Sequence, residues 1–272
     1  MFNDIFKYEF LTNALVASLL SSIICGIIGV IITEKKLTMM CGGIAHTAYG
    51  GVGLGYLLGI EPIIGAAAFS VSSAIAIGTI KRKTKANTDI IISLFWSLGM
   101  ALGVIFISLM EGYPPDMNAY LFGNILSVTK LDIYLMLILV GITFLFTLMF
   151  FNDLKAYMLD SEFASVVGIN TAFYEYAILI LTALSIVVVI RAVGIILCIA
   201  LFSAPCATAS LITKKLSLRM LISSLLSAIF CLFGLFISYN FTISSGAVII
   251  FVAAGVYFIA LTVKKNICKK LG

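Results

Sequence analysis

Charged side chains are scarce in this chain of 272 residues: only 11% are Asp, Glu, Lys or Arg, whereas 62% are hydrophobic. Soluble domains usually carry about 25% charged and about 45–50% apolar residues. With a mean hydropathy of +1.20, the chain has too little polar surface to fold as a soluble domain. The sequence therefore predicts an all-α, polytopic membrane helix bundle that forms one domain over residues 1–272 and lies in the plasma or inner membrane.

Residues and motifs for catalysis are equally scarce. The one histidine, His46, excludes a multi-histidine metal site within one chain. No GxxxxGK[ST] phosphate loop, HExxH or GxSxG motif occurs, which excludes ATP hydrolysis at a P-loop and two common hydrolase classes. The six cysteines form no CxxC pair and fit core packing better than disulfides or zinc ligands. We therefore expect no enzymatic activity and no permanently bound cofactor.

Apolar runs bounded by charges or turn residues predict nine crossings, with the N-terminus outside and the C-terminus inside. Their approximate ranges are 11–33, 44–60, 62–80, 90–110, 131–151, 176–190, 192–213, 219–239 and 244–263. Two of these runs are weak, because one is rich in glycine and only Arg191 separates 176–190 from 192–213, so eight crossings with a broken segment remain an alternative.

The basic residues support this topology. All except Lys7, Lys130 and Arg191 fall in segments that nine crossings place inside, which leaves 14 of the 17 on that side, in agreement with the positive-inside rule. The net charge of +5 would allow binding to nucleic acid, but charges that punctuate apolar runs orient spans instead. No nucleic-acid partner is expected.

His46 is the first candidate for a functional residue, because ionisable groups in a membrane usually line a pathway or contact a buried partner. A structural histidine bonded to a neighbouring carbonyl is the alternative. Glycine recurs at every fourth residue from Gly51 to Gly59, a spacing that predicts close packing of two helices. Cys41 and Cys206 are candidate soft ligands, although packing is the commoner role of cysteine.

Two further features fall in other segments. Pro205 lies inside the run 192–213 and predicts a helix break, because proline lacks the N–H donor and a broken helix can turn backbone oxygens toward a cavity. In the polar segment 152–175, Ser161 is expected to cap a short helix that ends at Gly168. Such a helix has the shape of a docking element, although an ordinary interfacial helix has the same pattern.

Several motifs in fixed order connect these features. They are Ala45-His46-Thr47, residues 97–103, residues 120–126 with Asp132, residues 160–164 with Gly168, residues 193–209 and residues 245–247. In their order and spacing the chain resembles, over nearly its whole length, the membrane permease subunit of the ABC importers for zinc, manganese and iron, the ABC-3 group.

The resemblance implies a homodimeric permease that takes a divalent metal from an extracytoplasmic binding protein, while two copies of an ABC ATPase hydrolyse ATP. It assigns the ATPase contact to Glu162, Ala164 and Gly168, and a transient metal contact to His46. Many relatives have an aspartate four residues before that histidine, where this chain has Gly42, so the carboxylate–imidazole pair is missing. The ligands that remain suit zinc or iron better than manganese.

Two other classes of protein remain as alternatives. A gradient-driven secondary transporter of a small cationic solute would need carboxylates within the membrane as ion relays, but the acidic residues lie at span ends or in loops. A membrane scaffold or sensor is the third class. Co-purification of an ATPase would favour the importer over both.

Overall fold

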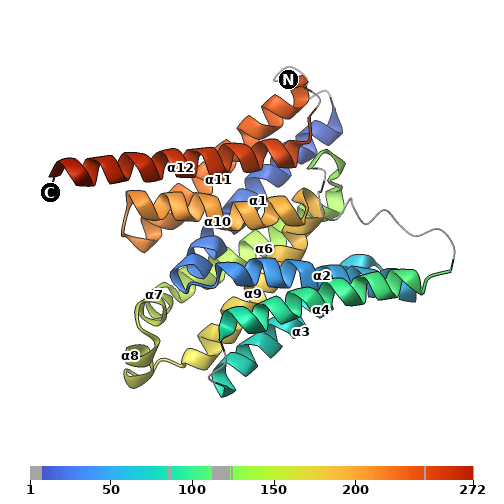
Figure 1. Cartoon of the computed structure of the whole chain (residues 1–272), viewed down its shortest axis with the longest axis horizontal. Helices are drawn as coiled ribbons and strands as arrows, with labels where there is room; N and C mark the ends of the chain where they lie inside the picture. The colour runs from blue at the N-terminus through green and yellow to red at the C-terminus, as the bar shows by residue number, and fades with distance from the viewer. Residues whose placement is uncertain (1–7, 85–86, 112–122, 124, 242, 272) are drawn as a thin grey trace.

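The structure is a computed structural model, and it describes residues 8–84, 87–111, 123, 125–241 and 243–271. Figure 1 shows a bundle of long helices, and no strand occurs among these residues. In chain order the elements are α1 (Glu9–Glu34), α2 (Thr38–Leu58), α3 (Pro62–Lys83), α4 (Thr88–Ser108), η1 (Ile125–Ser127), α6 (Lys130–Met149), α7 (Phe151–Leu159), α8 (Ser161–Val166), α9 (Thr171–Val193), α10 (Ile195–Ile212), α11 (Leu216–Phe241) and α12 (Ser245–Leu271).

Eight of the described helices are long and apolar enough to cross a membrane, namely α1, α3, α4, α6, α9, α10, α11 and α12. The predicted all-α membrane bundle is therefore confirmed. α2 is 21 residues long but is not among the eight, because its glycines, tyrosines and histidine lower its hydropathy. It packs mainly against α3 and α4, so much of its surface contacts protein. Whether α2 is a ninth crossing stays a prediction.

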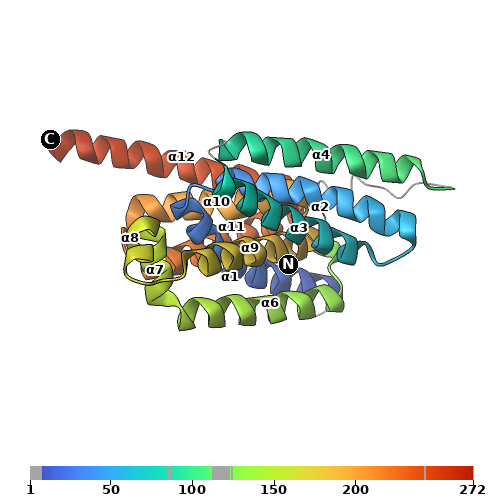
Figure 2. The ribbon, with the colours of Figure 1, turned by 90° about the horizontal axis from the view of Figure 1, so that it is seen from below.

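α1 and α9 form the centre of the bundle, and α4, α6 and α12 lie at its edge. The first two are the most buried of the candidate spans, and the last three are the least buried. α1 packs against α6, α10 and α11, whereas α9 packs mainly against α3. Figures 1 and 2 show α7 and α8 at one end of the bundle, where the C-terminal part of α12 projects beyond the other helices.

The predicted glycine seam exists between α2 and α3. A Cβ added to Gly51 would run into the backbone of Gly65, and one added to Gly55 would lie 2.8 Å from the Cα of Pro62. Gly59, the third glycine of the series, does not belong to the seam, and that part of the prediction was wrong. It ends α2 with φ +67°, a left-handed conformation that glycine adopts without strain.

Three helix boundaries differ from those expected. α2 begins at Thr38, six residues before the predicted run. Arg191 lies in the last turn of α9, and the chain instead breaks at Gly194, where φ is +83°. The helix break expected at Pro205 is absent, because α10 continues through it. Packing of α10 against α1, α11 and α12 holds the helix together where proline removes one hydrogen bond.

Several hydroxyl groups of α1 and α6 donate hydrogen bonds within their own helices. Ser18 and Ser22 of α1 donate to the carbonyl oxygens four residues earlier at 2.7 and 2.6 Å. Thr143 and Thr147 of α6 do the same at 2.8 and 2.7 Å. This bonding lets small polar side chains lie at apolar depth, where an unpaired hydroxyl would be destabilising.

Candidate functional site

The side chain of His46 lies between α2 and α4. Because α2 begins at Thr38, the histidine lies about 12 Å from the start of the helix, further along it than the predicted run indicates. Its ring stacks on the indole of Trp96, with centroids 4.2 Å apart and planes inclined by 15°. Its Nδ1 atom lies 3.2 Å from the sulfur of Met100. A thioether thus faces this nitrogen, in place of the carbonyl that the structural alternative required.

The aspartate missing at position 42 is explained by the same indole. A Cβ added to Gly42 would lie 2.6 Å from Cζ3 of Trp96, so the tryptophan ring occupies the space into which a longer side chain would extend. Trp96 and Met100 are four residues apart, on one face of α4. Sequence reasoning missed both of them, although the missing carboxylate indicated that something else fills this position.

The cysteines proposed as ligands are core residues. Cys41 and Cys206 are each 1% exposed. The sulfur of Cys206 lies 2.9 Å from the Ser223 hydroxyl and 3.5 Å from the carbonyl oxygen of Cys25. Across the part of the chain that the structure describes, no group of three or more His, Cys, Asp or Glu side chains gathers that could hold a metal ion.

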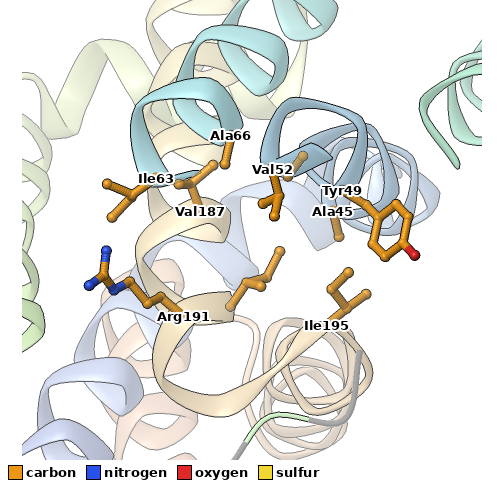
Figure 3. Close-up of a pocket in the computed structure, with 10 residues that line it drawn as sticks. Ala45, Tyr49, Val52, Ile63, Ala66, Val187, Arg191 and Ile195 are labelled. Atoms are coloured by element: carbon orange, nitrogen blue, oxygen red, sulfur yellow. The ribbon is translucent and has the colours of Figure 1, made fainter. Parts of the chain in front are cut away.

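A small cavity of about 20 Å³ lies between α2, α3, α9 and α10. Figure 3 shows Arg191 on one side of it and Tyr49 on the other, with aliphatic side chains between them. The Nε atom of Arg191 lies 2.5 Å from Oδ1 of the buried Asp132, which also caps α6 by accepting from the backbone and hydroxyl of Thr129 at 2.9 and 2.6 Å. A cavity with aliphatic walls and one guanidinium is unsuited to a metal cation.

The short segment α7–α8 is held by defined caps. The carboxylate of Asp160 accepts from the N–H groups of Glu162 and Phe163 at 2.9 and 3.0 Å, so Asp160 is the N-cap and the expectation of Ser161 was wrong. Asp160 has an extended backbone and directly precedes the first helical residue of α8. An N-cap residue typically has that conformation.

Gly168 follows the last turn of α8 at φ +93°. Its N–H donates to the carbonyl of Ser165 at 3.2 Å, and the N–H of Ile169 donates to that of Ala164 at 3.0 Å. These two bonds form a Schellman motif, which needs a left-handed residue at this position.

α8 turns a small face inward and apolar side chains outward. Ala164 is fully buried, whereas Glu162 is exposed. Four large apolar side chains of this segment are exposed by 62% or more, and we call them the α8 patch: Leu159, Phe163, Val166 and Val167. Such apolar groups at the end of a membrane bundle indicate a protein contact or the membrane interface. The separate helix α7 was not predicted.

Charged side chains connect this end of the bundle. Glu175 of α9 accepts from Lys81 and Arg82 of α3, both at 2.9 Å. Lys35 donates to the carbonyl of Tyr157 at 3.1 Å and lies 4.0 Å from the centroid of that ring. Burial, with Lys81 nearby, lowers the pKa of the Lys35 ammonium, and burial raises the pKa of the Tyr157 phenol.

The ends of α1, α3 and α9 thereby border the same hollow as α8. Residues that line it include Lys35, Lys81, Arg82, Glu162 and Glu175. A neighbouring hollow is lined by Lys155, Lys214, Lys215 and Arg219, all from segments predicted to be inside. The predicted inner segments that line these hollows therefore meet at one end of the molecule.

The motif at 120–126 lies largely outside the described residues. Of its positions, Gly123 has φ +62° and lies against the backbone of Val193 and Gly194, so the loop before α6 contacts the turn between α9 and α10.

The helices, their apolar surfaces and the capped end segment define a multi-pass protein of the cell membrane. The chain matches the model of the ABC 3 transport family over residues 7–264. It is 38% identical to an uncharacterised membrane protein of Synechocystis sp. over 95% of this chain and 92% of that protein. It is 34% identical to the manganese transport system membrane protein MntC of Listeria monocytogenes, over 93% and 90% of the two chains.

A solved structure agrees with these relatives. PsaBC from Streptococcus pneumoniae in complex with Fab matches with a TM-score of 0.85 at 32% identity, over 95% of this chain and 93% of that one. The chain belongs to the ABC 3 transport family. It is a permease subunit of an ABC importer and not an enzyme, as the sequence predicted.

Proposed function

We propose that this permease passes a divalent transition-metal ion from an extracytoplasmic binding protein into the cytoplasm, while a partner ATPase supplies the energy. MntC is named a manganese transport protein, and zinc and iron are the other candidate ions. The main support is the α8 segment, a capped helix with exposed apolar side chains in a chain that has no phosphate loop of its own.

The proposed coupling runs through α8. Glu162 and the α8 patch face a cleft of the ATPase, and Ala164 packs inward against the bundle. Because α8 packs against α7 and α9, and α7 packs against α1 and α6, a displacement of α8 is passed on to three spans. Rigid-body transmission through packed helices is an established way to couple two sites.

Gly168 tests this coupling. Gly168→Val forces a β-branched residue into φ +93°, which disfavours the Schellman motif. We expect normal membrane insertion and a several-fold loss of metal accumulation, measured in cells that contain the complete importer. Gly255→Val is the matched control, because nothing lies within 4 Å of a Cβ at that position. Wild-type accumulation in Gly168→Val would contradict the coupling role.

The proposed partners are two ATPase copies, a binding protein and a second copy of this chain. Affinity purification of the tagged chain from its native membrane tests this assembly. An ATPase should co-purify, and its absence under conditions that preserve other membrane complexes would remove the basis for ATP-driven transport.

The proposed cargo contact is transient. His46→Ala should lower metal accumulation without lowering the amount of chain in the membrane, because the imidazole is the only nitrogen ligand of its kind in the sequence. Accumulation of zinc, manganese and iron is compared in cells with and without the chain. Unchanged accumulation in His46→Ala would reassign the residue to structure.

The gradient-driven alternative is disfavoured by the ion pairs. The buried carboxylates Asp132 and Glu175 contact Arg191 and the Lys81–Arg82 pair, respectively. A carboxylate that pairs with a fixed cation is a poor relay for protons or sodium. These two acidic groups therefore fit a structural role.

A further inference from the structure

The groups around His46 are chemically softer than those expected for a manganese pathway. In place of the carboxylate of relatives there is Gly42, whose side-chain space is occupied by Trp96. The atom that faces the imidazole nitrogen is the thioether sulfur of Met100, at 3.2 Å. We propose that His46 Nδ1 and Met100 Sδ form a two-ligand site that selects soft and borderline cations, such as Zn²⁺, over Mn²⁺. This inference rests on the proposed function only in taking a metal ion as cargo.

The separation of the two ligand atoms suits one ion. Zinc bonds nitrogen at about 2.0–2.1 Å and sulfur at about 2.3 Å. With the ligand atoms 3.2 Å apart, these bonds enclose an angle of about 95° at the ion. One cation can therefore contact both atoms without displacement of either helix. His46 must then keep its proton on Nε2, because the lone pair of Nδ1 binds the ion.

Thioether sulfur decides the selectivity. Soft sulfur ligands favour zinc and copper(I), whereas manganese is best served by carboxylate, carbonyl and water oxygens and binds most weakly of the first-row divalent ions. The described residues supply no carboxylate cluster anywhere in the bundle. Met100 thus contributes affinity for Zn²⁺ and almost none for Mn²⁺.

The two helices hold these ligands in a fixed relation. A Cβ on Gly50 would lie 2.7 Å from the carbonyl oxygen of Gly99, and a Cβ on Gly99 would run into the backbone at Thr47. α2 and α4 therefore touch at their backbones beside the site. The stacked indole of Trp96 also restricts rotation of the imidazole. Both features pre-organise the pair.

The site is also open enough to release its ion. His46, Trp96 and Met100 are each partly exposed, so protein atoms of this chain do not close the remaining coordination positions. Closed four-ligand sites bind zinc permanently, whereas sites with open positions exchange their ligands. A two-ligand contact is therefore compatible with conduction, which requires that binding be weak enough for exit.

The chain contains its own reporter for the experiment. Trp96 is the only tryptophan and its ring stacks on the proposed ligand, so its fluorescence responds to an ion on His46. The full chain in lipid nanodiscs is titrated with Zn²⁺ and, separately, with Mn²⁺. We expect a saturable change with Zn²⁺ at a concentration at least about tenfold lower than with Mn²⁺.

Variants of Met100 test whether the thioether itself, and not a general preference of protein ligands for zinc, causes the difference between Zn²⁺ and Mn²⁺. Met100→Leu, which nearly conserves volume, should weaken Zn²⁺ binding at least about tenfold and leave Mn²⁺ binding unchanged. Met100→Glu should raise the affinity for Mn²⁺ relative to Zn²⁺. Met136→Leu is the control, because Met136 is fully buried in α6 and should not alter either titration.

Equal Zn²⁺ affinity in the wild type and Met100→Leu would overturn the proposal, as would an unchanged titration in His46→Gln. Met100→Gln keeps the length of the side chain and replaces Met100→Leu if the latter does not fold. Uptake assays distinguish failure of the His46–Met100 site from failure of the proposed import function. If metal import is unchanged in the Met100 variants, the two-ligand site is wrong but the proposed function stands. If the metal content of the cells does not depend on the chain at all, the proposed function is wrong.

Discussion

Glu175 illustrates how one residue joins two helices. Its carboxylate is buried and contacts Lys81 and Arg82, two cations at the end of α3. A buried acid without partners would be strongly destabilising, and breaking such a pair leaves uncompensated charge on the remaining partners. This residue therefore fixes the ends of α3 and α9 beside α8.

Glu175→Gln should lower the stability of the chain. The two cations would lose their counter-charge and repel each other, but both are about one-third exposed, so solvent reduces the loss to about 1–2 kcal/mol. Thermal unfolding in detergent measures it. Glu9→Gln is the control, because the Glu9–Lys130 pair is mostly exposed and should leave the unfolding temperature unchanged. Equal shifts in the two variants would contradict the role of burial.

The roles of single residues were predictable from the sequence where a particular backbone conformation favours one residue type. Gly168 was recognised as a helix stop because a left-handed residue after a short helix favours glycine. The N-cap was misplaced by one residue, since Asp160 and Ser161 are both good caps and only the backbone angles distinguish them. Trp96 and Met100 were missed because their role depends on contact between α2 and α4, which no local pattern encodes.

At the scale of elements, α2 is the helix that sequence hydropathy describes least well. Its glycines bring it into backbone contact with both α3 and α4. Close packing of small residues stabilises helices in membranes, where no hydrophobic effect drives their association. The glycines lower the hydropathy of α2, and the same glycines allow it to pack closely against its neighbours.

Gly51→Ala should disrupt this packing. The added methyl group runs into the backbone of Gly65, which cannot rotate away as a side chain can, so we expect a loss of about 1–3 kcal/mol. Unfolding temperature and the yield of folded protein on size-exclusion chromatography measure the effect. Gly141→Ala, with no atom within 4 Å of the new Cβ, should be tolerated. A tolerated Gly51→Ala would mean that α2 and α3 separate readily.

Apolar runs in the sequence predicted the approximate places of the long helices but not their ends. The turn at Gly194 was assigned to Arg191, because a charge in an apolar run resembles a boundary. In the folded chain Arg191 pairs with Asp132, which removes the need for it to reach water. Tertiary pairing of this kind is invisible in a hydropathy profile.

At the scale of the whole molecule, the distribution of charge defines two ends. Lys35, Lys81 and Lys214 line the hollows near α8, whereas Lys130 begins α6 beside Glu9. Positive charge in short loops stays on the cytoplasmic side during insertion. The predicted orientation therefore places α8 in the cytoplasm.

Labelling of single introduced cysteines tests this orientation. Glu61 lies in the turn before α3, and Ser217 lies in the first turn of α11. Both are exposed, and the topology assigns them to opposite sides. In intact cells a membrane-impermeant maleimide should label Glu61→Cys but not Ser217→Cys, and permeabilised cells should show both. Five native cysteines are buried and give a low background, namely Cys25, Cys41, Cys198, Cys206 and Cys231. Labelling of Ser217→Cys in intact cells would reverse the assignment.

The α8 patch has a consequence for the life of the protein in the cell. Leu159, Phe163, Val166 and Val167 are exposed on the isolated chain, and exposed apolar groups are what chaperones and proteases recognise. If the ATPase covers this patch, as proposed, a subunit made without that partner offers a degradation signal that assembly removes. The abundance of this permease should follow that of its ATPase, so that uncoupled copies do not accumulate in the membrane.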